Sequence, residues 1–194
     1  DSLTIWYYER ILLLSSDVHP NPGPTHQDHN PGHLSFCNWN LNTLSKDNFQ
    51  RVSLLEAHNS EFQYDIISLC ETSLTNETPV SDNILPGYIY QPLNHPCVNR
   101  SGGVGIFYKD SLPLRVRSDL SFNECLVTEL LFERKKIFFT VLYRNPKDKA
   151  NSPEFELFLK NFENLVLRIR NDNPYSMFFT GDFNGQTQTW YPEG

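Results

Sequence analysis

A carboxylate and a carboxamide directly follow an apolar segment near the end of the chain. Residues 176–185 read SMFFTGDFNG, and their apolar and β-branched part predicts a strand that is buried on both faces and ends at Gly181. Asp182 and Asn184 come next. Buried strands of open α/β sheets build active sites by delivering such groups at their carboxyl ends. The alternative is that GDFNG is only the turn after a strand.

Three other predicted strands also end in polar groups. Asn40 lies at the end of an alternating segment that begins at Leu34, Glu71 ends the apolar run of residues 64–72, and Tyr143 ends residues 136–143. A charged side chain at the end of a buried strand costs free energy unless it meets a cation or hydrogen-bond donors. Two carboxylates, two carboxamides and a phenol at one sheet edge suit a hard metal ion such as Mg²⁺. They also suit metal-assisted hydrolysis of a phosphodiester.

The elements that must position these groups alternate between strands and helices. Helices are expected over residues 47–60, with Asp47 as N-cap, and over residues 153–170, with Ser152 as N-cap. Because one strand precedes and one follows the first helix, a parallel crossover unit is expected. Further strands are predicted near residues 88–91, 102–108, 114–117, 124–133 and 136–143, the last two joined by a hairpin turn at residues 134–135.

Five motifs in this order resemble the endonuclease/exonuclease/phosphatase superfamily. They are NWNLNTL (38–44), DIISLCET (65–72), SGGVGIFYKD (101–110), VLYRNP (141–146) and GDFNG (181–185). Within that superfamily the chain resembles the endonuclease domain of LINE-type (non-LTR) retrotransposon proteins, relatives of the abasic-site endonucleases. The resemblance covers residues 34–194. It implies an α/β sandwich of mixed sheets, as in abasic endonucleases and deoxyribonuclease I.

The resemblance also implies a role for each matching residue. Glu71 is the expected principal ligand of Mg²⁺, with Mn²⁺ as the alternative ion, and Asn40 supports that site. Tyr143 is expected to contact the scissile phosphate, and Asn184 to hold water and phosphate. Asp182 is expected to orient and deprotonate the attacking water. Arg144 and Asn145, which follow Tyr143 in the motif, are expected to bind substrate. The implied reaction nicks one DNA strand and leaves a 3′-hydroxyl, which primes a downstream reverse-transcriptase domain of the same polyprotein.

One departure from the family pattern concerns histidine. The family carries an Asp-His pair on a late strand, whereas all six histidines of this chain lie at or before residue 95. The chain is therefore expected to be a domain truncated at its C-terminus, about a quarter of it missing, and to be weak or inactive as an isolated enzyme.

The first 33 residues are expected to form a tail or linker rather than core. Residues 17–33, DVHPNPGPTHQDHNPGH, contain four prolines, two glycines and four histidines. The stretch DVHPNPGP (17–24) resembles 2A-type ribosome-skipping peptides, with His19 in place of the family's acidic residue. A plain Pro-rich linker is the alternative.

Composition and charge restrict the class of protein. The net charge of −7 comes from residues 1–100, which hold 4 Lys+Arg and 11 Asp+Glu, so a broad basic face that grips nucleic acid is not expected. An acidic metal site remains compatible with a nuclease. No membrane span or secretion signal is expected. The four cysteines lack CxxC spacing and three lie in apolar runs, which indicates buried thiols in a reducing compartment. An intracellular protein acting on DNA in the nucleus is expected.

Two other functions remain open on the sequence. The first is a phosphodiesterase or phosphatase of the same superfamily that acts on lipid or inositol phosphates, which the lack of a membrane-binding element disfavours. The second is a non-catalytic truncated remnant. The presence of Asn40, Glu71, Tyr143, Asp182 and Asn184 argues against a decayed sequence.

Overall fold

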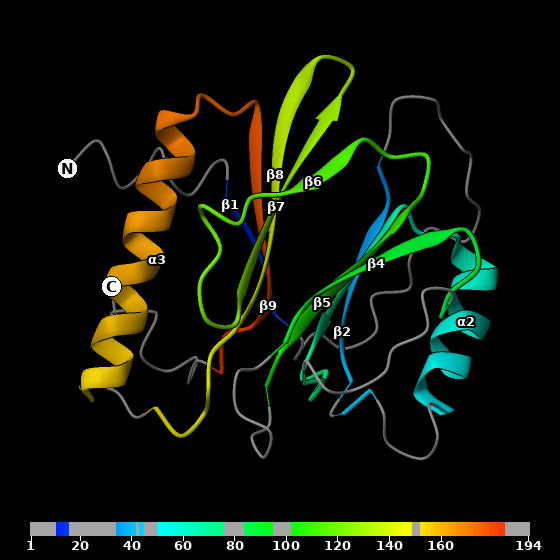
Figure 1. Cartoon of the computed structure of the whole chain (residues 1–194), viewed down its shortest axis with the longest axis horizontal. Coiled ribbons are helices and arrows are strands. Elements are labelled where there is room, and N and C mark those ends of the chain that lie inside the picture. The colour runs from blue at the N-terminus through cyan, green and yellow to red at the C-terminus, as the bar shows by residue number, and fades with distance from the viewer. Residues whose placement is uncertain are drawn as a thin grey trace, which may run out of the picture.

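Two β-sheets pack face to face, and each carries one helix on its outer side, in the computed structural model (Figure 1). The structure describes residues 11–15, 34–41, 43–44, 50–75, 84–94, 102–148 and 152–184. The predicted N-cap Asp47, the 2A-like stretch of residues 17–24 and Cys97 lie outside these residues. Within the described residues, no helix is long and apolar enough to cross a membrane.

The first sheet has five strands in the order β1-β9-β8-β7-β6. Their bounds are β1 Ile11–Ser15, β6 Leu114–Val116, β7 Cys125–Phe132, β8 Lys135–Tyr143 and β9 Ser176–Asp182. β9 runs parallel to both β8 and β1, whereas β7 is antiparallel to both β6 and β8. The sheet is therefore mixed, as the resemblance implies.

The second sheet has four strands in the order β2-β3-β5-β4. Their bounds are β2 Phe36–Asn40, β3 Ile66–Cys70, β4 Tyr88–Leu93 and β5 Val104–Lys109. β2 and β3 are parallel and are connected through helix α2, Gln50–Phe62, which confirms the predicted crossover. Pro92 lies within β4, where it is tolerated because β4 is an edge strand of this sheet.

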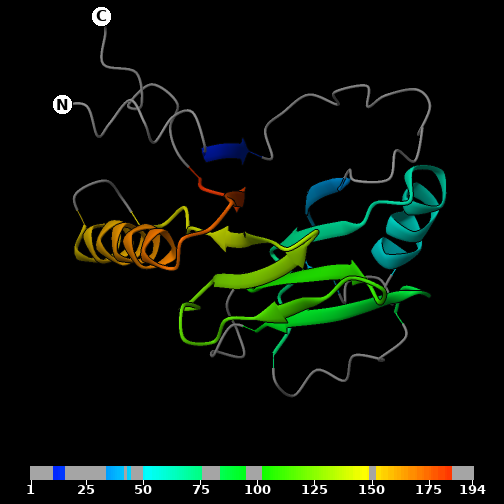
Figure 2. The same cartoon turned by 90° about the horizontal axis from the view of Figure 1, so that it is seen from above.

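Three apolar clusters hold the layers together. One lies between the sheets and includes Ile66, Ile106 and Phe139, and one fixes α2 to the outer face of the second sheet. The third packs helix α3, Pro153–Asn171, on the outer face of the first sheet through Leu165 and Ile169. Strands with both faces covered need continuous apolar runs, which is why the sequences of β3, β7 and β8 lack alternation. Figure 2 shows the same layers from above.

Both ends of α3 are fixed by polar groups. Ser152 caps the first turn by accepting a hydrogen bond from the amide of Phe155 at 3.2 Å, as predicted. At the other end, Arg117 donates to Asp172 at 2.5 Å and to the buried Glu129 of β7 at 2.8 Å. The guanidinium of Arg117 lowers the pKa of Asp172. The helix is therefore held to the sheet by charge pairing as well as by its apolar stripe.

Two boundaries differ from the sequence prediction. The β7–β8 turn consists of Glu133 and Arg134, with φ of 48° and 64°, because Phe132 pairs with Lys135. Two successive positive φ values match the twist of a two-residue hairpin. In addition, Gly181 does not end its strand: β9 continues to Asp182, which pairs with Tyr143.

The N-terminal segment contributes a strand that was not expected. β1 lies in the region predicted to be a tail, yet it pairs in parallel with β9 from Ile11 beside Met177 to Ser15 beside Gly181. The outer edge of β9 therefore has a strand partner. Within the described residues, the other sheet ends at β2, whose strand partner is β3.

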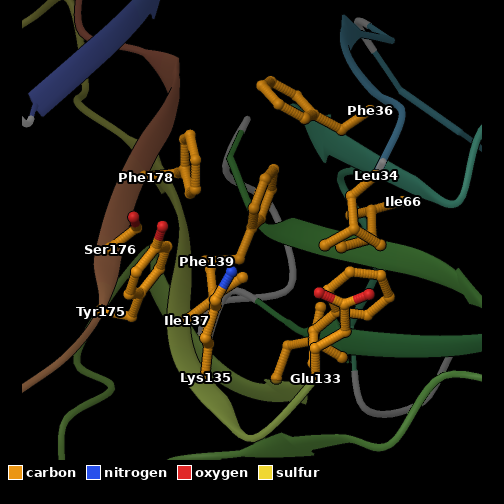
Figure 3. Close-up of a pocket in the computed structure, with 12 residues that line it drawn as sticks. Leu34, Phe36, Ile66, Glu133, Lys135, Ile137, Phe139, Tyr175, Ser176 and Phe178 are labelled. Carbon is orange, nitrogen blue, oxygen red and sulfur yellow. The ribbon is translucent and has the colours of Figure 1, made fainter. Parts of the chain in front are cut away.

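An apolar pocket of about 300 Å³ opens between the sheets where β2, β8 and β9 begin (Figure 3). Phe36 of β2 bridges its walls, with its ring centroid 5.3 Å from that of Phe139 and 5.6 Å from that of Phe178. Since Asn40 and Asp182 end β2 and β9, the pocket lies at the opposite end of the sandwich from the polar strand ends.

A substitution of Gly181 can test how closely the main chains of β8 and β9 approach each other. Its φ is +134°, and a Cβ atom would lie 1.8 Å from the carbonyl oxygen of Leu142. We expect Gly181→Ala to lower the free energy of unfolding by about 3 kcal/mol or more, because main-chain atoms must move. Gly87→Ala is the matched control, since its φ is +80° but no atom lies within 4 Å of the added methyl group. It should cost only about 1–2 kcal/mol. Equal losses in urea denaturation would contradict the close approach.

Candidate active site

The polar ends of four strands meet at one end of the sandwich. Asn40 is the last residue of β2 and Glu71 follows β3, both in the second sheet. Tyr143 and Asp182 are the last residues of β8 and β9 in the first sheet, and they pair with each other. Each sheet thus contributes two groups. Within each sheet the two groups lie side by side because the strands that carry them, β2 and β3 or β8 and β9, are parallel.

The side-chain amide of Asn40 joins the two carboxylates. Its Nδ2 donates to Oε1 of Glu71 at 3.2 Å and to Oδ2 of Asp182 at 3.0 Å. The second bond crosses from one sheet to the other. Two like charges thus converge on one neutral donor group, and they would repel each other without it.

The main chain around Glu71 continues the sheet beyond the strand ends. Thr43 donates its amide to the carbonyl of Glu71 at 2.7 Å, and the amides of Thr72 and Ser73 donate to Gly103 and Gly102 at 3.2 and 2.8 Å. Glu71 has a φ of 53°, a left-handed conformation that costs free energy for a residue other than glycine. Neighbours on both sides therefore hold the Glu71 backbone in an unfavourable conformation that points its carboxylate toward Asn40.

Asp182 is held through both carboxylate oxygens. Oδ1 accepts the amide of Asn184 at 2.9 Å, and Oδ2 accepts the side-chain amide of Asn40. Asn184 has a φ of 44°, which asparagine tolerates better than most residues. Its Nδ2 donates to the carbonyl of Arg144 at 2.6 Å. The GDFN stretch is therefore a turn, and this turn orients the Asp182 carboxylate.

Tyr143 is a buried phenol among negative charges. Burial is the largest cause that raises its pKa, followed by the charges of Glu71, Glu124 and Asp182 and a hydrogen bond to Glu71. The phenol consequently keeps its proton at neutral pH and can donate a hydrogen bond.

Glu124 is a site residue that the sequence analysis did not single out. It precedes β7 with a φ of 58°, and its carbonyl accepts the amide of Tyr143 at 2.9 Å. Its charge contributes to the raised pKa of Tyr143. The hairpin register could have revealed it, because Cys125 pairs with Leu142 and the residue before Cys125 then lies beside Tyr143.

Arg144 and Asn145, expected to bind substrate, both lie next to the site. The Arg144 guanidinium donates to the main-chain carbonyls of Phe183 at 2.5 Å, of Asp148 at 2.7 Å and of Asn184. Asn145 Oδ1 accepts the amide of Lys147 at 3.0 Å and so shapes the turn after β8.

Cys70 lies beside the site as a buried thiol. Its Sγ is 3.5 Å from the carbonyl oxygen of Leu142, and burial is the main cause that raises its pKa to about 12. Burial also raises the pKa of Cys37 to about 12. Protonated thiols are poor nucleophiles and poor metal ligands, so Cys70 serves packing here.

The donor chemistry fits a hard divalent cation. The described residues contain no group of three or more His, Cys, Asp or Glu side chains that could hold a metal ion. The Glu71 and Asp182 carboxylates and the Asn40 carboxamide still offer oxygen ligands of the type that Mg²⁺ prefers. A cation between the two carboxylates would also offset their mutual repulsion.

Residues 37–193 match the family model described as Endonuclease/Exonuclease/phosphatase family. The chain belongs to this family. The matched residues include strands of both sheets and the polar groups at the strand ends. A search of curated proteins finds no significant match.

Solved structures show the same α/β fold with two mixed sheets. The AP endonuclease LMAP from Leishmania major has a TM-score of 0.62 at 20% identity, with 83% of this chain and 59% of that chain covered. The endonuclease domain of TRAS1, a telomere-specific non-LTR retrotransposon, has a TM-score of 0.57 at 16% identity, covering 81% and 63%. A variant of the 3′ phosphatase NExo from Neisseria, bound to a product DNA hairpin, has a TM-score of 0.58 at 17% identity, covering 78% and 58%. The chain thus spans about three-fifths of each of these structures.

The Asn40 bridge can be tested without reference to activity. In Asn40→Asp an acceptor replaces the donor, and a third negative charge comes within hydrogen-bond distance of Glu71 and Asp182. We expect a loss of about 1–3 kcal/mol in the free energy of unfolding, measured in urea at pH 7 with a chelator present. Asn164→Asp, which adds the same charge to the exposed face of α3, should change it by less than about 0.5 kcal/mol. Similar effects of the two substitutions would refute the bridge.

Proposed function

We propose that this domain is a Mg²⁺-dependent DNA endonuclease that hydrolyses one phosphodiester bond and leaves a 3′-hydroxyl. The observation that carries the proposal is the Asn40 amide, which joins Glu71 of one sheet to Asp182 of the other. Such a cluster gathers oxygen ligands and a general base within the reach of one phosphate group.

Glu71 is the principal metal ligand in this proposal, and Asn40 supports it. Bound Mg²⁺ would offset the negative charge that develops on the phosphate oxygens. The strained backbone of Glu71 suits this role, since left-handed conformations of non-glycine residues cluster at functional sites.

Asp182 orients the attacking water and accepts its proton as the water oxygen bonds to phosphorus and the P–O3′ bond breaks. The departing O3′ takes up a proton from solvent and becomes the 3′-hydroxyl. Its two hydrogen bonds fix the carboxylate before substrate arrives. Asn184 holds water and phosphate. Tyr143 donates its hydroxyl hydrogen to a phosphate oxygen, a role supported by its place at the end of β8, paired with Asp182.

We further propose that the domain belongs to a LINE-type retrotransposon polyprotein with a downstream reverse-transcriptase domain. The ordered motifs and the fold shared with a non-LTR retrotransposon endonuclease domain support this proposal. DNA is then the substrate, and the nucleus is the place of action. The 2A-like residues 17–24 fit the same context.

A phosphatase or phosphodiesterase of the same superfamily is the second candidate. One of the similar structures is that of a 3′ phosphatase bound to a product DNA hairpin, which favours this alternative. The two reactions differ in the bond that is broken, so product analysis separates them. A DNA endonuclease nicks closed circular DNA, whereas a phosphatase releases inorganic phosphate from a terminal or inositol phosphate.

Metal binding at Glu71 should raise thermal stability. A ligand at ten times its dissociation constant stabilises the native state by about 1.4 kcal/mol. For a chain of this size the midpoint of thermal unfolding should rise by roughly 3–6 °C in Mg²⁺. Glu71→Gln should lose this response. Glu61→Gln, on the exposed surface of α2, is the matched control and should retain it. A Glu71→Gln variant that responds to Mg²⁺ as the parent does would refute the assignment.

Nicking of supercoiled plasmid tests the activity itself. The family's late Asp-His pair has no matching histidine here, since all six histidines lie at or before residue 95. Loss of one electrostatic or general-acid group typically costs about 10²–10⁴ in rate, so the 194-residue chain should nick weakly in Mg²⁺. The chain extended through its own reading frame to an Asp-His strand should nick strongly, and Asp182→Ala should abolish that gain. Robust nicking without the extension would show that the histidine is dispensable. An extended chain that is inert on DNA but releases phosphate from an inositol phosphate would support the phosphatase instead.

A further inference from the structure

The guanidinium of Arg144 donates hydrogen bonds to three main-chain carbonyls, and the residue is half-buried. Nε donates to Phe183 at 2.5 Å, Nη1 donates to Asp148 at 2.7 Å, and Nη2 donates to Asn184. The guanidinium carbon also lies 5.3 Å from the ring centroid of Phe155, in the first turn of α3. Hydrogen bonds along the edge of the guanidinium therefore fix its position, and the aromatic ring of Phe155 lies near it.

The main chain of Arg144 adds two further bonds to the same turn. Its amide donates to the carbonyl of Asp182 at 2.8 Å, and its carbonyl accepts Nδ2 of Asn184 at 2.6 Å. Together with the bonds to Phe183 and Asn184, a single residue thus bonds to each of the three residues of the turn 182–184. Arg144 therefore holds this turn against the end of β8.

We propose that Arg144 is a positioning residue for Asp182, acting through the turn of residues 182–184, and not a cation that binds the DNA phosphate. We call the hydrogen bonds from Arg144 to residues 182–184 the Arg144 clamp. The inference rests on the proposed function, because the clamp serves to orient the Asp182 carboxylate. Asn184 donates its amide to Asp182 Oδ1, so a shift of Asn184 moves the carboxylate as well. A misplacement of about 1 Å can cost about 10²-fold in rate.

Lysine cannot replace arginine in this arrangement. A guanidinium holds its donors in one rigid plane, so it reaches three carbonyls in different directions, whereas an ammonium is a point charge on a flexible stem. Arg144→Lys therefore keeps the positive charge and loses the clamp. Arg144→Met loses both, and the two variants separate positioning from charge.

The first test measures single-turnover nicking as a function of DNA and salt concentration. We expect both Arg144 variants to lower the maximal rate about 10²-fold. The DNA concentration at half-maximal rate should change less than about threefold, and the slope of log affinity against log salt should be unchanged. Lys147→Met removes an exposed cation three residues away and is the control for charge loss; it should leave the maximal rate unchanged. If Arg144→Lys keeps the parent's rate while Arg144→Met weakens DNA binding and reduces the salt slope by about one, the clamp is refuted.

The second test needs no activity. Amide hydrogen exchange reports the two amides whose bonds define the turn, those of Arg144 and Asn184. Both should exchange at least about tenfold faster in Arg144→Lys and Arg144→Met, with little change in Lys147→Met and in the core strands. Unchanged exchange in Arg144→Lys would overturn the proposal even if Arg144→Met failed to fold. If the parent chain nicks no DNA in any form yet exchange responds as expected, the proposed endonuclease fails and the clamp stands.

Discussion

The site depends on one amide group placed between two carboxylates. Glu71 and Asp182 belong to different sheets, and their negative charges would drive the ends of those sheets apart in the absence of a compensating group. The Asn40 amide supplies two donors without a charge of its own. A lysine or arginine there would neutralise the carboxylates permanently and leave no reason for a cation to bind. A neutral donor instead holds the two acids in place and leaves their negative charge for the divalent ion proposed above.

The two sheets hold Asn40 in that position. β2 and β3 are parallel, so Asn40 and Glu71 leave the second sheet in the same direction, and the ladder continues past both strands through Thr43 and Gly103. β8 and β9 repeat the arrangement in the first sheet, where the Gly181 backbone lies so close to Leu142 that a side chain has no room. The aromatic contact between Phe36 and Phe139 fixes the spacing of the two sheets at the far end. The geometry of the site is thus set by strand pairing and sheet packing, and its side chains add little freedom.

Most of the scaffold could be predicted from the sequence, because buried strands and an amphipathic helix leave clear patterns. The runs that became β3, β7 and β8 are mainly apolar, and α3 carries a regular apolar stripe with Ser152 before it. Contacts between residues distant in sequence were harder to predict. The strand β1 was missed because its partner is more than 160 residues away and the prolines that follow it suggested a tail. Glu124 was missed because its approach to Tyr143 depends on the hairpin register, and the turn that sets this register was placed one residue too late. The bond from Asn40 to Asp182 likewise joins two sheets, which no local pattern records.

Arg144 shows why a residue's type and neighbourhood are insufficient to assign its role. A cation directly after a tyrosine that is expected to contact phosphate suggests that it also binds phosphate, and the sequence offers no reason to think otherwise. Three main-chain carbonyls nevertheless accept hydrogen bonds from its guanidinium: those of Phe183 and Asn184 in the turn of residues 182–184, and that of Asp148 after β8. Carbonyls without hydrogen-bond donors near the half-buried Asp182 carboxylate would cost free energy, and a residue with several rigid donors removes that cost while neutralising part of the local negative charge. The same group thereby permits the left-handed Asn184 and, through it, the orientation of Asp182. A positive charge next to an acidic site can therefore serve the protein's own backbone before it serves a substrate.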